Sequence, residues 1–260
     1  MRGRDTVFAW TLALAASAGC AQPQGPRIEV VQPSGPQVPS SLLRLSVRFA
    51  GPVQGGVLPH LSLRHVDGTS IAEPFLEQEL WSPDGRTLTI LLHPGRVKTD
   101  LRAHVAMGPV LAEGDDVALA LDGRVLRRWH VGPPDESGPA PSAWSLSPVH
   151  AGTREALVVT LDAPIDGQDT DYLAIADEHG RRVPGRARLA DGEGRWSFVP
   201  DRPWRSRSYR LMVRGTLEDA SGNRVGSRFE TSLAAPAGAA TDVAIPFAPD
   251  VSAGRRAPRR

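Results

Sequence analysis

The sequence predicts an all-β protein made of two tandem β-sandwich domains. Short runs in which apolar and polar residues alternate follow one another between Gly-, Pro- and Asp-rich turns, and no convincing helical period of 3.6 residues is present. The order of these runs repeats after a proline-rich break at residues 132–141. With 260 residues, 40% of them hydrophobic, the chain is long enough to bury two ordinary cores.

The N-terminal residues 1–19 have the pattern of an export signal. Arg2 and Arg4 make a basic start, and an apolar stretch follows at residues 7–16. That stretch is too short to cross a bilayer, which takes about 20 helical residues. Small residues then lead directly to Cys20.

The sequence Ser-Ala-Gly-Cys at residues 17–20 resembles the lipobox of bacterial lipoproteins, in which the cysteine thiol receives diacylglycerol before cleavage. The resemblance implies that Cys20 is the lipidated first residue of the mature chain, labelled by palmitate and held at a membrane. Ala21 in the next position implies, by similarity to enterobacterial lipoproteins, sorting to the outer membrane. The expected location is therefore the cell envelope, on the periplasmic face or the cell surface. Ordinary cleavage after Ala18, which would leave Cys20 as a free thiol, is the alternative.

Composition excludes several kinds of chemistry and partner. Cys20 is the single cysteine, so the folded body has no disulfide and no thiolate metal site. The chain has 30 basic and 29 acidic residues, and removing residues 1–19 leaves 28 of each. This balance gives no reason to expect nucleic acid as a partner.

The first domain is expected at residues 27–133, after a short tether at 20–26 that is rich in Pro, Gly and Gln. In residues 43–49, Leu, Leu, Val and Phe alternate with Arg, Ser and Arg, which is typical of a half-buried strand. The strands expected in this domain, in chain order, are residues 28–31, 43–49, 61–66, 87–92, 117–121 and 127–131.

The second domain is expected at residues 142–233, after a linker at 134–141. Residues 43–53 align with 155–165 at an offset of 112, and the next strand repeats at the same offset. The other corresponding pairs are 61–71 with 173–183, 84–94 with 192–203, and 117–121 with 209–213. The Ala-, Pro- and Gly-rich residues 234–260, which end in four arginines, are expected to be a disordered tail.

This succession of strands resembles the bacterial Ig-like domains of S-layer and other envelope proteins. The resemblance rests on the strand LRLSVRFAGPV at 43–53, on hairpins such as SPDGR at 82–86, and on the D-x-x-G-N hairpin at 219–223. The tandem also resembles uncharacterised two-domain secreted proteins. It implies two Ig-like sandwiches in an envelope compartment and supplies no activity.

Two segments of the first domain have no counterpart in the second and are candidates for a binding surface. One is the inserted loop at residues 95–113, and the other is an acidic and aromatic strip within residues 73–81. Loops on a rigid sandwich commonly carry binding residues. The alternative is an ordinary loop that caps the sandwich, with Phe75 and Trp81 in the core. The candidate surface consists of Glu73, Phe75, Glu77, Trp81, Arg96, Lys98, Arg102 and His104.

No pattern in the sequence predicts catalysis, and we expect no enzyme activity and no cofactor. The histidines are scattered without metal-binding spacing, and no nucleophile elbow or phosphate-binding glycine loop is present. Asp219 and Asn223 are weak calcium candidates, since oxygen ligands alternate there, but such residues are first of all turn formers.

The function expected from the sequence is that of a membrane-anchored envelope lipoprotein whose Ig-like modules have a structural or protein-interaction role. A glycan-binding module of the envelope is the first alternative, and a hydrolase is the least favoured one. The partner is expected to be an envelope protein or glycan.

Overall fold

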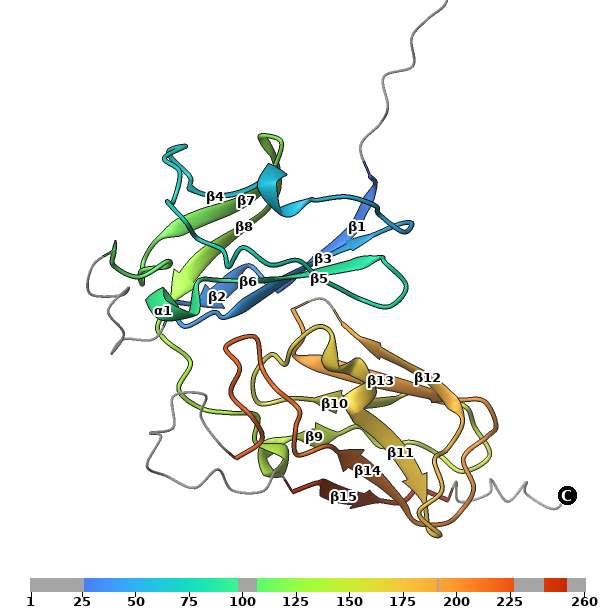
Figure 1. Cartoon of the computed structure of the whole chain (residues 1–260). Helices are drawn as coiled ribbons and strands as arrows, with labels where there is room; N and C mark the ends of the chain where they lie inside the picture. Colours follow the sequence, from blue (N-terminus) through green and yellow to red (C-terminus); the bar gives the residue numbers. More distant parts are fainter. Residues whose placement is uncertain (1–25, 98–106, 191, 227–240, 252–260) are drawn as a thin grey trace, which may run out of the picture.

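Two β-sandwiches follow one another along the chain and lie one above the other in Figure 1. The computed structural model describes residues 26–97, 107–190, 192–226 and 241–251. Each sandwich consists of two sheets with a hydrophobic core between them. The predicted all-β, Ig-like sandwich architecture is confirmed.

The first sandwich packs two four-stranded sheets face to face. Most neighbours are antiparallel, and the exception is the parallel pair β2–β8. One sheet has the order β1 (Ile28–Gln32), β3 (Arg44–Phe49), β6 (Thr87–Leu91), β5 (Leu80–Trp81). The other has the order β2 (Gln37–Pro39), β8 (Arg124–Gly132), β7 (Asp116–Leu121), β4 (Leu61–His65). Short helical turns lie at η1 (Leu58–His60) and α1 (Pro94–Val97).

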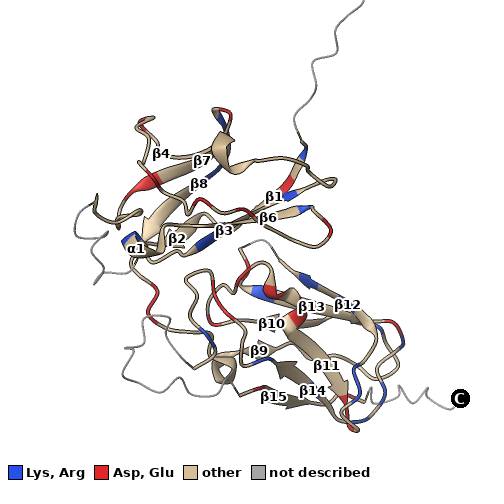
Figure 2. Ribbon diagram, in the orientation of Figure 1, with Lys and Arg blue, Asp and Glu red and all other residues tan. Residues whose placement is uncertain are grey.

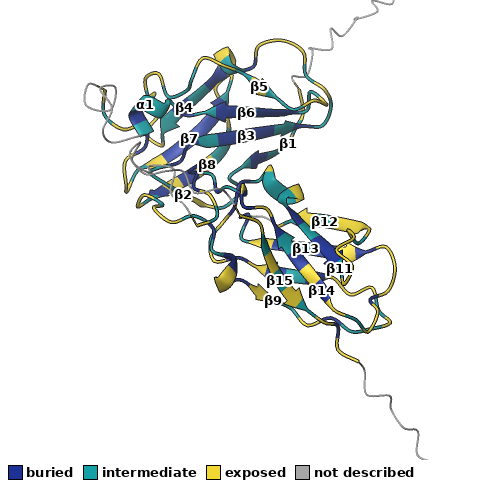
Figure 3. Cartoon of the chain, turned by 60° about the horizontal axis from the view of Figure 1, so that its bottom comes forward, coloured by how far each residue is buried: buried dark blue, intermediate teal, exposed yellow. Residues whose placement is uncertain are grey.

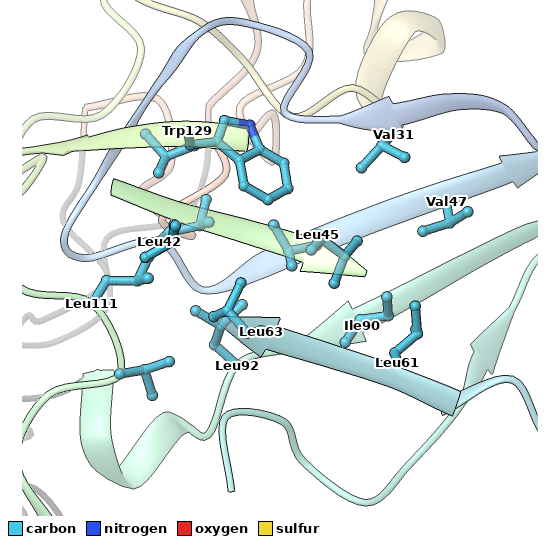
Figure 4. Packing of buried hydrophobic residues seen from close by; sticks show 14 of the residues in the cluster. Val31, Leu42, Leu45, Val47, Leu61, Leu63, Ile90, Leu92, Leu111 and Trp129 are labelled. Carbon is cyan, nitrogen blue, oxygen red and sulfur yellow. The ribbon is translucent and has the colours of Figure 1, made fainter. Parts of the chain in front are cut away.

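The core of the first sandwich comes from the inward faces of both sheets (Figure 4). Leu45 and Val47 on β3 meet Leu63 on β4 and Trp129 on β8 between the sheets. The indole of Trp129 is 2% exposed, and its Nε1 donates to the Pro33 carbonyl oxygen at 2.9 Å. This bond satisfies the polar edge of the ring inside an apolar core.

The second sandwich repeats the same topology, with the strand equivalent to β2 reduced to a bridge. One sheet has the order β12 (Gly185–Leu189), β13 (Arg195–Pro200), β10 (Leu157–Thr160), β9 (Ser145–Leu146). The other has the order β11 (Leu173–Asp177), β14 (Tyr209–Val213), β15 (Val243–Phe247). A parallel bridge between His150 and Asp250 takes the place that β2 has beside β8. The turns η2 (Pro141–Ala143) and η3 (Asp169–Tyr172) complete this part.

Three tryptophans belong to the second core. Trp144, Trp196 and Trp204 are 7%, 0% and 2% exposed. The Trp204 ring packs edge-on against Tyr209 at a centroid distance of 5.2 Å, and its Nε1 donates to the Glu155 carbonyl oxygen at 2.8 Å. These rings are packing anchors and do not form an exposed stacking platform.

The internal repeat that was read from the sequence matches the strands. β4 begins at residue 61 and β11 at residue 173, so the two differ by the expected 112 residues. By their positions in the sheets, β3 also corresponds to β10, β6 to β13, and β7 to β14.

One prediction is corrected by the last strand. Residues 243–247 were assigned to a disordered tail, yet they form β15 and pair along the whole of β14. The segment Val-Ala-Ile-Pro-Phe alternates apolar and small residues, and three of its side chains pack against the second core. The second sandwich therefore extends past the predicted boundary at residue 233. Within the described residues no helix is both long and apolar enough to cross a membrane.

Figure 3 shows that buried residues concentrate on the central strands of each sandwich and that β12 is largely exposed. Cys20 lies outside the described residues, as do the rest of the predicted signal and most of the tether.

Candidate functional site

The acidic and aromatic strip predicted in the first domain is divided between solvent and core. Glu73 and Glu77 are exposed, whereas Phe75 and Trp81 are half-buried and pack against the first core. The Trp81 ring lies 5.8 Å from the Phe49 ring, and its Nε1 donates to Glu79 Oε2 at 2.8 Å. The aromatic rings of the strip thus stabilise the sandwich, Glu79 bonds to one of them, and Glu73 and Glu77 are exposed.

Arg96 in the inserted loop is buried, with 5% of its surface exposed. Its guanidinium donates to the carbonyl oxygens of Gly108 at 3.0 Å and Pro109 at 2.9 Å, and also to that of Ala72. By bonding to these carbonyl oxygens, the guanidinium links the two ends of the inserted loop to the residue that precedes the acidic and aromatic strip. The other basic residues of the candidate surface, Lys98, Arg102 and His104, lie outside the described residues.

The two calcium candidates belong to a self-contained hairpin. Asp219 Oδ1 accepts from the backbone N–H groups of Ser221 at 2.8 Å and Asn223 at 3.0 Å, and Asn223 Nδ2 donates to Asp219 Oδ2 at 2.8 Å. All three side chains are buried. Within the described ranges, no group of three His, Cys, Asp or Glu side chains is placed to hold a metal ion.

This same hairpin, residues 219–223, is where the second sandwich contacts the first. Ala220 packs against the first core, and its carbonyl oxygen accepts from the backbone N–H groups of Leu43 at 3.0 Å and Arg44 at 3.2 Å. Asn223 Nδ2 also donates to the carbonyl oxygen of Asp135 in the linker, at 3.2 Å. The hairpin thus supplies the backbone contact between the domains.

Beside the hairpin, Arg44 of β3 pairs with two carboxylates of the second domain. Its Nε lies 2.9 Å from Asp166 Oδ2, and its Nη2 pairs with Glu218 Oε2. The Asp166 side chain is only 7% exposed, against 23% for Arg44. Burial lowers the pKa of Arg44, but the neighbouring carboxylates outweigh it and the pKa is raised on balance. The neighbouring carboxylates therefore favour the charged form of Arg44.

A second cluster at the same junction is built around the buried carboxylate of Glu193. Ser34 in the first domain donates to it twice, from its backbone N–H at 2.9 Å and from its hydroxyl at 2.6 Å. The N–H of Gly192 donates back to the Ser34 hydroxyl at 2.7 Å. Glu193 has a φ of 51°, in the left-handed region that costs a non-glycine residue energy. Its 2% exposure and its bonds to Ser34 hold it in that conformation.

Between these two clusters, glutamines from both domains meet. Gln168 Nε2 donates to Gln32 Oε1 at 2.9 Å and to the Ser46 hydroxyl at 3.1 Å. The junction leaves a cavity of about 70 Å³, which is lined by both domains. A space of that size holds one or two water molecules and is far below the several hundred Å³ of a typical ligand pocket. The polar groups around this cavity come from both domains and bind the domains to each other.

Three carboxyl groups of the junction, those of Asp166, Asp169 and Asp219, have raised pKa values. Burial raises the pKa of Asp169 to about 7 and that of Asp219 to about 6. Burial also raises the pKa of Asp166, against the opposing effect of Arg44. The junction therefore changes its protonation between mildly acidic and neutral pH.

No family model matches this sequence, and no curated protein matches it. Among solved structures it is similar to an L,D-transpeptidase from Mycobacterium smegmatis, with 13% identity, a TM-score of 0.27, and coverage of 64% of this chain and 62% of the other. The chain thus spans less than two thirds of that protein. It is also similar to domains 5–6 of the S-layer protein SbsC, with 11% identity, a TM-score of 0.25, and coverage of 86% and 99%. A third similar structure is SGBP-B from a xyloglucan utilization locus of Bacteroides uniformis, with 12% identity, a TM-score of 0.27, and coverage of 73% and 46%.

Proposed function

We propose that this protein is a membrane-anchored envelope lipoprotein whose two Ig-like sandwiches act as one docked unit in a structural or protein-interaction role. The observation that carries the docked unit is the junction, where Arg44, Asp166 and Glu193 are all buried or half-buried. The anchor is supported by the Ser-Ala-Gly-Cys sequence that ends in Cys20.

Docking is favoured because, if the domains separated, polar and charged groups of each would lose the hydrogen-bond and ion-pair partners that the other domain supplies. Glu193 would lose the hydroxyl and N–H donors of Ser34, and Asp166 would lose its cationic partner Arg44. Truncating one partner of a buried charge pair costs several kcal/mol, mainly because the other charge is left unpaired. Separation of the domains exposes these groups to water, so its free-energy cost is lower than that of truncating one partner. The specific pairing nevertheless favours one relative orientation of the two domains.

The anchor is tested by metabolic labelling of the full chain with a palmitate analogue in a bacterial host. The wild-type protein should incorporate the label and sediment with the membrane fraction, and Cys20→Ser should do neither. A matched control, Cys20→Ser with Gln22→Cys, keeps one thiol two residues away and should also remain unlabelled. Label that persists in Cys20→Ser would refute lipidation at this residue.

A further inference from the structure

Five carboxylates of the second domain gather at its junction end, while Asp177 and Asp201 lie at the opposite end among arginines. Figure 2 shows acidic residues on the loops of the second domain that face the first, and basic residues on β12 and on loops at the far end. The carboxylates at the junction end are Asp166, Asp169, Glu193, Glu218 and Asp219. On the sheet β12–β13–β10–β9 and around its end near Pro200, arginines outnumber carboxylates, so this region presents a mainly positive surface to solvent.

The outer face of the sheet β12–β13–β10–β9 is one part of that positive surface. None of these four described strands contains an Asp or Glu. Arg186 and Arg188 on β12 are exposed, while the alternate residues Ala187 and Leu189 pack against the core. Both arginines therefore point to the same outer face, spaced by two residues, or about 6.8 Å.

An open cleft of about 530 Å³ adjoins the start of β12 and the end of β13. Gly185 pairs with Pro200 at this end of the sheet, and both chain segments continue directly into the cleft wall. Its floor includes Trp204 and Tyr209, which are 2% and 5% exposed, and the Tyr209 hydroxyl accepts from the backbone N–H of Arg205 at 3.1 Å. The cleft is thus formed against residues of the second core.

Five arginines and two carboxylates, Asp177 and Asp201, line this cleft, and the arginines are of two kinds. Arg181 pairs with Asp177 at 3.0 Å and Arg207 with Glu178 at 3.1 Å. The other three, Arg182, Arg202 and Arg205, are exposed, and none of them forms an ion pair with a described residue. We define the arginine surface as these three together with the exposed arginines of the adjoining sheet: Arg182, Arg186, Arg188, Arg195, Arg202 and Arg205.

We propose that the arginine surface binds an acidic polysaccharide, with the chain seated in the cleft and continuing across β12. Guanidinium groups form paired hydrogen bonds with carboxylates, and a row of them matches a polymer that carries repeated carboxylates. The inference goes beyond the proposed function, since neither the anchor nor the domain junction needs this ligand.

Other polymers and surfaces fit the arginine surface less well. Binding to a lipid bilayer would need exposed apolar side chains, and the only large one exposed on the described strands of this sheet is Val199, at 38% exposure. Neutral glycans and single-stranded nucleic acids need aromatic faces for stacking, but Trp204 and Tyr209 are buried in the floor.

The test measures binding of the purified full chain to polygalacturonate and to the same polymer after methyl esterification, which removes its charges. The variant is Arg186→Ala with Arg188→Ala, and a second variant, Arg202→Glu, reverses a charge at the cleft. The matched control is Arg124→Ala with Arg128→Ala, which removes two exposed arginines from β8 of the first domain. Polyphosphate and phosphatidylglycerol vesicles are the competing probes.

Polygalacturonate should bind and its ester should not, and the β12 double variant should weaken binding about tenfold, because each exposed charge pair contributes a few-fold. The first-domain control should change binding less than twofold, and affinity should fall as salt rises. The proposal is overturned if the ester binds equally well, if the control loses as much as the variant, or if polyphosphate or vesicles bind more tightly. None of these outcomes affects labelling at Cys20, so failure here is distinct from failure of the proposed anchor.

Discussion

Replacing Arg44 by alanine tests whether the junction ion pair stabilises the docked protein. The change leaves Asp166 with a side chain that is 7% exposed and without its cation. Loss of one partner of a buried pair costs about 3–5 kcal/mol. Glu218 keeps its second partner Arg224, whose Nε lies 2.8 Å away, and Arg44 is itself partly solvated. We therefore expect a loss near the lower limit, about 2–3 kcal/mol in the free energy of unfolding.

The measurement is chemical denaturation followed by both tryptophan fluorescence and far-UV circular dichroism. The same strand supplies a matched control, Arg48→Ala, which removes an ion pair with Glu29 at 3.3 Å in which the side chains are 43% and 46% exposed. That loss should stay below about 1 kcal/mol. A double-mutant cycle of Arg44→Ala with Asp166→Asn should give a coupling energy of about 1–3 kcal/mol. The reasoning fails if Arg44→Ala and Arg48→Ala destabilise equally, or if the two changes in the cycle are additive.

Two further predictions concern the second domain. Burial raises the pKa of Asp169 to about 7 in the folded protein, while an unfolded Asp has a pKa of about 3.9. Between these two pH values the folded state binds more protons than the unfolded state. The free energy of unfolding therefore falls as pH rises through this window. The melting temperature should thus be lower at pH 8 than at pH 5, and Asp169→Asn should flatten this dependence; a melting temperature that rises over this range would contradict the sign. Gly185→Ala should destabilise the protein by about 1–3 kcal/mol in thermal melts, because the added Cβ would collide with the Phe198 ring on β13. The control Gly51→Ala should be close to neutral, because its added Cβ has no atom within 4 Å. Equal melting temperatures for these two variants would argue against the packing described at β12.

The sequence predicted the strands well because alternation records which face of a sheet is buried. The pattern at 43–49 located β3, and the repeat at an offset of 112 located β10 and β11. It failed at β15, a five-residue strand that contains a proline and follows an Ala- and Gly-rich run; the place of β15 is fixed by pairing with β14.

The junction could not be predicted from local patterns. Alternation places Ser46 on the polar face of its strand, but the residue is buried, at 6% exposure, and donates to Gln32 while Gln168 of the second domain donates to it. Arg44 and Asp166 are separated by more than a hundred residues, and nothing in either neighbourhood marks them as partners. The sequence around Glu193 reads Gly-Glu-Gly, which is typical of a turn. The burial of Glu193 and its left-handed φ are seen only in the structure, where glycine would ordinarily occupy such a position.

The most direct test of a single docked unit is the distance between spin labels on the two sandwiches, measured by pulsed electron–electron double resonance. Arg128→Cys on β8 and Arg210→Cys on β14 place labels on exposed strand positions, with Cys20→Ser removing the native thiol. The docked junction predicts one narrow distance distribution, which should broaden when Arg44→Ala and Glu193→Gln are added. A broad distribution in the protein with an intact junction would contradict the account.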